Sequence, residues 1–223
     1  MDAWVATAPR AYSARELLAD RSIHWLGVTA GALGSLVLVS IAVGARGAGG
    51  LVPIAIYAAG LLAMLGFSAA YNLTPPSPRR AWLRRWDHAA IFVMIAGTYT
   101  PFTVDRLTGA WSILLTALVW ALSLAGALVK FFNPRRLERG SVALYLALGW
   151  IGIVAARPLL AALDVPTLLL LGAGGLLYSI GTLFHLWRRL PFQNAVWHGF
   201  VLSAAACHYA AVLHGVVLAG LAL

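Results

Sequence analysis

Two short stretches place polar side chains at helical spacing beside long apolar segments. In SAAYNL, Ser68 and Asn72 are four residues apart, and in FQNAVWHGF the same spacing separates Asn194 from His198. Residues four apart lie on one face of a helix, near the end of an apolar run in both cases. Imidazole groups can ligate zinc, whereas amides and hydroxyls more often form buried hydrogen-bond networks. The two pairs are therefore candidate halves of one metal site, or of a polar network in its place.

The composition of the chain indicates the environment in which this chemistry would occur. Of its 223 residues 61% are hydrophobic and 10% are charged, and the mean hydropathy is +0.85. A chain this apolar is typical of a polytopic membrane protein, with membrane lipids as partners. The net charge of +9 comes from short clusters between apolar runs, so no nucleic-acid partner is expected. The single Cys207 excludes an internal disulfide and a cysteine-based zinc site.

Seven apolar segments are long enough to cross a bilayer, which takes roughly 20 residues. They cover approximately residues 22–44, 52–73, 86–104, 109–131, 141–162, 165–187 and 194–221. Arg157 and Pro158 interrupt the fifth. The sequence therefore predicts an all-α integral membrane protein, a seven-transmembrane-helix bundle. Residues 1–223 would form one domain, opening with a short segment over about residues 1–21, and its oligomeric state stays open.

The basic residues predict the orientation of this bundle. Arg46, Arg106 and Arg157 fall on one side of the membrane, and the other thirteen basic residues fall on the opposite side. These thirteen are Arg10, Arg15, Arg21, Arg79, Arg80, Arg84, Arg85, Lys130, Arg135, Arg136, Arg139, Arg188 and Arg189. Because basic residues accumulate on the cytoplasmic side, the N-terminus is predicted to be cytoplasmic and the C-terminus outside.

This topology brings polar residues from distant segments to one depth near the cytoplasmic side. Ser68 and Asn72 close the second span, Asp87 and His88 open the third, and Asn194 and His198 open the seventh. Ionisable groups inside a membrane are costly and tend to mark a site. The same leaflet also receives four further residues, namely Glu16, Asp20, His24 and His185. Glu16 and His24 either support or gate the site, or form a buried hydrogen-bonded pair. His208 and His214 lie too far along the seventh span to join it.

Several of these stretches resemble a known family. SAAYN, RRWDHAAIFVMIAGTYTPF (84–102), GTLFHLWRRLPF (181–192) and AVWHGFVLSAAACHY (195–209) are similar to the hemolysin III group of the progestin and adipoQ receptor (PAQR) family. RELLADRSIHWLGVTAG resembles that group's opening segment. The resemblance implies a seven-helix bundle in the plasma membrane, the inner membrane of a bacterium, with a cytoplasmic N-terminus. It also implies zinc held by three histidines near a serine and an aspartate. Animal members are linked to adiponectin signalling and ceramide hydrolysis, and some bacterial members to haemolysis or pore formation.

The sequence departs from the family at two of the implied zinc ligands. Ser68, Asp87 and His198 match the family pattern, but Asn72 and Asn194 stand where it has histidines. An amide oxygen is a weak zinc ligand, and Asp87 with His198 would be too few for tight binding. The sequence therefore predicts at most a remnant of the zinc site, rebuilt as a polar network joining the second, third and seventh spans.

Three functions remain open from the sequence. The first is a non-catalytic membrane protein, namely a regulator of membrane or lipid state, a sensor or a channel, and it is slightly favoured because the metal ligands are few. The alternative is a metal-dependent hydrolase of lipid amides, resembling a ceramidase, with Asp87 as general base and Ser68 assisting. This enzyme would need a further ligand, such as Asp87 itself, His88 or His185. A third is a site for another, more weakly held cation.

Overall fold

The computed structural model describes residues 12–46, 50–133 and 140–221, and every regular element in these segments is helical. The α-helices are α1 (Ala14–Arg46), α2 (Leu51–Leu73), α3 (Pro78–Asp105), α4 (Gly109–Phe132), α5 (Ser141–Gly149), α6 (Ala156–Ala162), α7 (Val165–Leu186) and α8 (Gln193–Val212). Shorter turns follow α5 and α8: a 3₁₀ turn at Ile151–Ala155, a π-helical turn at Leu213–Leu218 and a 3₁₀ turn at Ala219–Leu221. Of the residues used for orientation, Arg10, Arg135, Arg136 and Arg139 lie outside the described segments.

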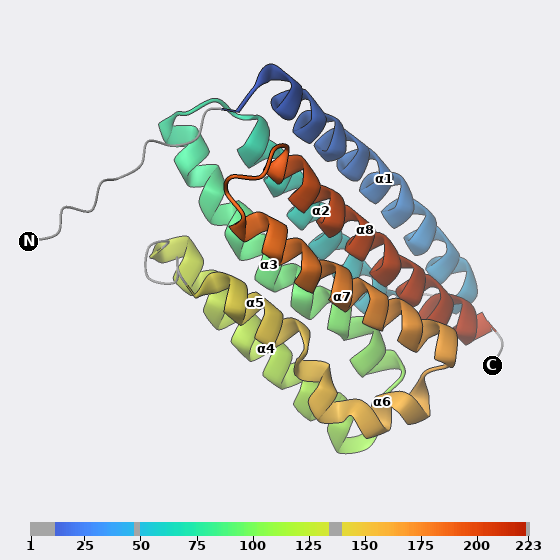
Figure 1. Cartoon of the computed structure of the whole chain (residues 1–223). Coiled ribbons are helices and arrows are strands. Elements are labelled where there is room, and N and C mark those ends of the chain that lie inside the picture. The colour runs from blue at the N-terminus through green and yellow to red at the C-terminus, as the bar shows by residue number, and fades with distance from the viewer. Residues whose placement is uncertain (1–11, 47–49, 134–139, 222–223) are drawn as a thin grey trace, which may run out of the picture.

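The helices form an elongated bundle, with α1 along one side and α4 and α5 along the other (Figure 1). Helix α2 packs between α1 and α3, and α3 packs in turn against α4. Helix α8 contacts both α7 and α1, so the first helix of the chain and its last long helix lie side by side in the bundle. This contact brings the first turns of α1 next to the first turns of α8.

Six segments of the described chain are long and apolar enough to cross a membrane. They are Ala14–Gly44, Leu51–Leu73, Gly109–Phe132, Ser141–Ala162, Val165–Leu186 and Gln193–Leu218. The architecture is thus that of an all-α membrane protein, as the sequence predicts. The third predicted span, 86–104, lies on α3, which is not among the six. The first turns of α3 carry basic residues, and the span itself carries Asp87, His88 and several threonines.

Helix α3 is nevertheless an interior helix. Most of its second half is buried, including Thr98 and Thr100. Their hydroxyls donate to backbone carbonyls one turn earlier, Thr98 to Met94 O at 2.9 Å and Thr100 to Ala96 O at 2.7 Å. Because these polar groups are satisfied within the helix, α3 can lie between α2 and α4 without exposing them to lipid.

The predicted interruption of the fifth span is present. The segment divides into α5, the 3₁₀ turn and α6, and Pro158 lies in the first turn of α6. Proline lacks the amide hydrogen and its ring clashes with the carbonyl four residues earlier, so an unbroken helix cannot continue through Val154. The break therefore falls at the 3₁₀ turn Ile151–Ala155, just before the turn of α6 that contains Pro158.

Glycine allows a close helix contact in the core, between α2 and α3. A Cβ atom at Gly97 would lie 3.3 Å from Ile56 O, and one at Gly60 would lie 3.4 Å from Met94 Cα. Backbones that approach this closely need small residues on both helices. The contact fixes α3 against α2, and so fixes Asp87 relative to Ser68.

Candidate functional site

The start of α1 is held by a capping box. The backbone amide of Ser13 donates to Glu16 Oε2 at 2.8 Å, and the amide of Glu16 donates to Ser13 Oγ at 3.3 Å. This reciprocal pattern satisfies free amides at a helix N-terminus. Glu16 Oε1 also accepts a 2.8 Å hydrogen bond from the amide of Phe192, whose φ of 56° turns the chain into α8. Glu16 therefore ties the start of α1 to the start of α8.

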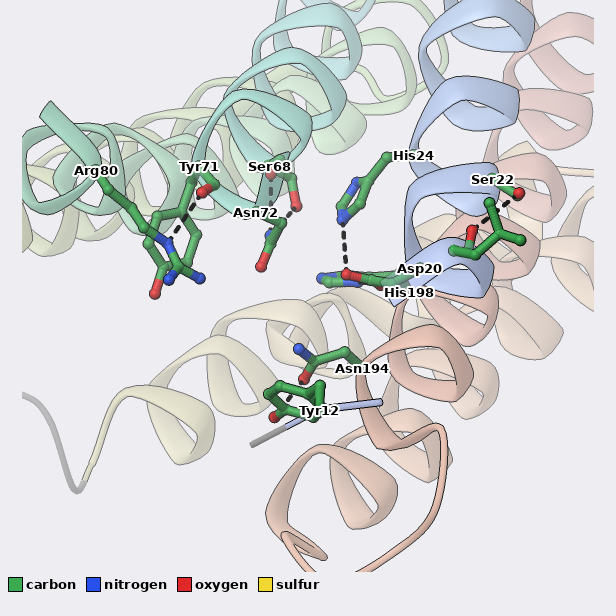
Figure 2. Close-up of polar contacts among 11 residues, drawn as sticks. Tyr12, Asp20, Ser22, His24, Ser68, Tyr71, Asn72, Arg80, Asn194 and His198 are labelled. Carbon is green, nitrogen blue, oxygen red and sulfur yellow. Dashed lines mark hydrogen bonds and ion pairs between the residues drawn. The ribbon is translucent and has the colours of Figure 1, made fainter. Parts of the chain in front are cut away.

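Three side chains lie close together one helical turn beyond the hydrogen bond between Glu16 and Phe192. Asp20 and His24 lie one turn apart on α1 and are 7% and 6% exposed, and His198 lies in the second turn of α8. His198 Nδ1 is 2.6 Å from Asp20 Oδ1, and His24 Nε2 is 3.7 Å from Asp20 Oδ2. The imidazole rings are 4.3 Å apart between centroids. One donor atom from each residue lies within 4.8 Å of the others. Figure 2 shows the His24 ring pointing toward Asp20 and His198.

The chemistry of these donors fits zinc. Two imidazoles and one carboxylate form a ligand set of catalytic zinc sites, which keep a further position open. Within the described residues, His24 Nε2 is buried and has no hydrogen-bond partner. A buried nitrogen of this kind is costly unless something binds it. The unsatisfied atom faces Asp20, where a metal ligated by all three residues would lie.

Ser68 and Asp87 adjoin this group from α2 and α3. The Ser68 hydroxyl and the His198 ring both interact with the Asp87 carboxylate. His88 Nε2 lies 3.9 Å from Asp87 Oδ2. The structure thus brings together Ser68, Asp87 and His198, the three residues that match the family pattern.

The two asparagines have other partners. Asn72 Nδ2 donates to Ser68 O at 2.9 Å, one turn earlier in its own helix. Asn194 Oδ1 accepts from the Tyr12 hydroxyl at 3.4 Å, and the same hydroxyl is 3.3 Å from Gln193 Oε1 (Figure 2). The amides therefore bind the helix backbone and the segment before α1.

A small cavity adjoins the Asp20 carboxylate. Its volume is about 10 Å³, room for a single water molecule. The lining residues are Tyr12, Glu16, Leu17, Asp20, Phe192, Asn194 and Ala195. Carboxylate and amide groups in this lining can hydrogen-bond a water, so the cavity gives the Asp20 side of the group a place for one.

The remaining histidines occupy separate positions. His185 packs its ring against Trp197 at 4.9 Å between centroids, and interacts electrostatically with His198. His208 Nε2 is 3.4 Å from Leu171 O, and His214 Nε2 is 2.7 Å from Asp164 Oδ2 at the start of α7. His208 and His214 thus have partners on α7, away from the group around Asp20.

From the sequence, Asp20 was expected in the same leaflet as His198 but was not paired with His24 and His198 as a ligand. Asp87 was grouped with His198 instead, whereas the three-donor group found among the described residues is Asp20, His24 and His198. A signal was present, since Asp20 and His24 are four residues apart and so share a helix face. Depth alone does not say which face of α1 points toward α8.

The chain is similar in sequence to known proteins over most of its length. The model of the family described as "Haemolysin-III related" matches residues 17–209. The chain is 35% identical over 202 residues to "Hemolysin-3 homolog" of Bacillus subtilis (strain 168), covering 91% of this chain and 95% of that protein. It is 45% identical over 127 residues to "Hemolysin-3" of Bacillus cereus, covering 57% of this chain and 58% of that protein. Human "Monocyte to macrophage differentiation factor" is 27% identical over 165 residues, which are 70% of this chain and 67% of that protein.

Proposed function

The chain belongs to the haemolysin-III related family, and from that premise we propose that it is a metal-dependent membrane hydrolase acting on lipid amides. The observation that carries the proposal is the buried group of Asp20, His24 and His198, with its unsatisfied nitrogen on His24. This group answers the objection that Asp87 and His198 alone would hold zinc poorly. The metal would be ligated mainly from α1 and α8.

Asp20, His24 and His198 would hold the zinc. When bound, zinc supplies a Lewis acid for an amide carbonyl and lowers the pKa of a bound water to about 7. Asp87 would act as the general base, because it interacts electrostatically with His198 from a separate helix and is outside the ligand group. The Ser68 hydroxyl would orient the Asp87 carboxylate. Glu16 would keep α1 and α8 in register, which fixes the distance between Asp20 and His198.

The proposal includes a topology. Helix α3 would also cross the bilayer, in the interior of the bundle, which brings the number of spans to seven. The N-terminus would face the cytoplasm, and the protein would lie in the plasma membrane. The distribution of basic residues supports this orientation. The candidate metal group would then lie near the cytoplasmic leaflet, within reach of lipid headgroups.

A second candidate function rests on a different observation. The 2.6 Å contact between Asp20 and His198, together with the hydrogen bonds of Asn72 and Asn194, satisfies most of the cluster without a metal. A network closed in this way favours a non-catalytic sensor, channel or regulator of membrane state. The two functions differ in whether the protein hydrolyses a lipid amide, in a reaction that would need Asp87.

The test is hydrolysis of a ceramide by the zinc-loaded, detergent-purified chain. We expect release of fatty acid by the wild type, and a loss of at least about 100-fold in Asp87→Asn, because a general base contributes roughly 10²–10⁴. Asp87→Asn should keep its zinc, since Asp87 is outside the ligand group. The matched control is Asp164→Asn at the other end of α7, which should retain activity. A wild type that binds zinc but releases no fatty acid would favour the non-catalytic function.

A further inference from the structure

A groove lies between α1 and α2, lined by residues other than those of the candidate metal group. Its volume is about 320 Å³, within the range of roughly 300–1,000 Å³ typical of ligand sites. The lining residues are Trp25, Val28, Gly66, Ala69, Ala70, Leu73, Thr74 and Arg79. The groove has an apolar part, formed by α1 and α2, and a polar end, formed where the chain passes from α2 to α3.

Small residues of α2 make the apolar part hollow. Gly66, Ala69 and Ala70 recur at helical spacing, and a Cβ atom at Gly66 would meet nothing within 4 Å. The indole of Trp25, 61% exposed, contributes a wall from α1. These residues belong to two segments long and apolar enough to cross a membrane. In a bilayer this part of the groove faces hydrocarbon, and an acyl chain is the ligand that matches it.

The polar end begins where α2 ends. Thr74 follows the last residue of α2, and Arg79 lies in the first turn of α3. Among the described residues Arg79 is exposed and makes no hydrogen bond or ion pair. Its neighbour Arg80 is engaged, since Nε donates to Tyr71 O at 3.3 Å and the guanidinium lies 5.0 Å from the Tyr71 ring centroid (Figure 2). Arg79 thus offers a positive charge at the point where the apolar groove leaves the membrane.

We propose that this groove binds one phospholipid with a net negative headgroup. Its acyl chain would lie against Trp25 and the small residues of α2, and its phosphate would contact the Arg79 guanidinium. A basic side chain at the membrane surface attracts anionic lipid, and arginine is well suited to phosphate. The lipid would join α1 to α2, and α1 carries Asp20 and His24. The site is independent of whether a metal or a catalytic reaction exists at Asp20.

The test is native mass spectrometry of the full chain in detergent, titrated with dioleoylphosphatidylglycerol and with dioleoylphosphatidylcholine. We expect one phosphatidylglycerol to bind at least about fivefold more tightly than phosphatidylcholine, the preference that one arginine near the surface provides. Arg79→Gln should remove this preference. Gly66→Leu, which fills the groove, should weaken the binding of both lipids. Trp25→Ala, which removes the exposed indole that forms one wall of the groove, should also weaken the binding of both lipids.

Two matched variants separate the groove from general effects. Arg189→Gln removes an exposed charge in the loop between α7 and α8, and Gly172→Leu adds the same side chain at a glycine of α7 with nothing within 4 Å. Both should bind phosphatidylglycerol like the wild type. Equal affinity of the wild type for the two lipids would overturn the proposal. So would equal losses in Arg79→Gln and Arg189→Gln, or unchanged binding in both Gly66→Leu and Trp25→Ala.

Discussion

Asp20 Oδ1 lies 2.6 Å from His198 Nδ1, although the two residues are 178 positions apart in the chain. The contact joins the first helix of the bundle to the last. It also changes the expected composition of the metal site, because α1 supplies two donors in a chain where two expected histidines are asparagines. The two imidazoles that the family resemblance implies on α2 and α8 are thus matched by one carboxylate and one imidazole on α1.

Glu16 is predicted to determine this contact by holding the two helix starts together. Glu16→Ala removes the acceptor of the Ser13 and Phe192 amides. We expect a loss of about 2 kcal/mol in stability, since a cap and a hydrogen bond to a charged group are both removed. Thermal unfolding in detergent measures this loss, and hydrogen exchange at the Phe192 amide should rise with it. Arg15→Ala, at an exposed neighbouring position, is the control; equal destabilisation in both variants would contradict the assigned role.

Close packing of α2 on α3 predicts a second effect. Gly97→Leu places a side chain against the backbone of Ile56, because a Cβ atom there would lie 3.3 Å from its carbonyl oxygen. We expect destabilisation of about 1–3 kcal/mol from overpacking, and a displaced Asp87 as a consequence. Gly172→Leu, with open space around the glycine, should unfold near the wild-type temperature. The packing argument fails if the two variants unfold alike.

The far end of the bundle predicts a pH dependence. Hydrogen bonds from Thr167 hold the pKa of Asp164 below its usual value, and the neighbouring His214 adds a smaller effect in the same direction. A carboxylate with a lowered folded pKa stabilises the protein fully above its unfolded pKa of about 3.9, and this contribution is lost as the pH falls through the folded pKa. Asp164→Asn should therefore lower the unfolding temperature at pH 6 and make a progressively smaller difference below pH of about 4. A difference that is constant over this range would contradict the assignment.

Much of the fold could be predicted from the sequence because long apolar runs specify membrane helices directly. The break before Pro158 follows from the chemistry of proline, and the depth of Ser68, Asp87 and His198 follows from counting spans. The role of Asp20 could not be predicted in the same way. It depends on the rotation of α1 about its own axis, which is set by tertiary contacts such as the packing of α1 on α2 and α8 and the hydrogen bond between Glu16 and the Phe192 amide. That contact joins residues 176 positions apart, and no local pattern encodes it.

The polarity of α3 also shows the limit of hydropathy. A helix that is buried between other helices can carry threonines and an aspartate without contact with lipid. Its sequence therefore lacks the strong apolar signal of its neighbours, and its assignment as a span depends on packing. The partners of Asn72 and Asn194 likewise depend on the folded structure, since Asn72 donates to Ser68 O and Asn194 accepts from the Tyr12 hydroxyl.

The central claim is that Asp20, His24 and His198 hold a metal, and the direct measurement is the zinc content of the detergent-purified protein by plasma mass spectrometry. We predict close to one zinc per chain in the wild type, in Asp87→Ala and in the control His214→Asn. We predict that zinc is lost in Asp20→Ala, His24→Ala and His198→Ala. A wild type without metal above background, or an Asp20→Ala variant that keeps its zinc, would contradict the account.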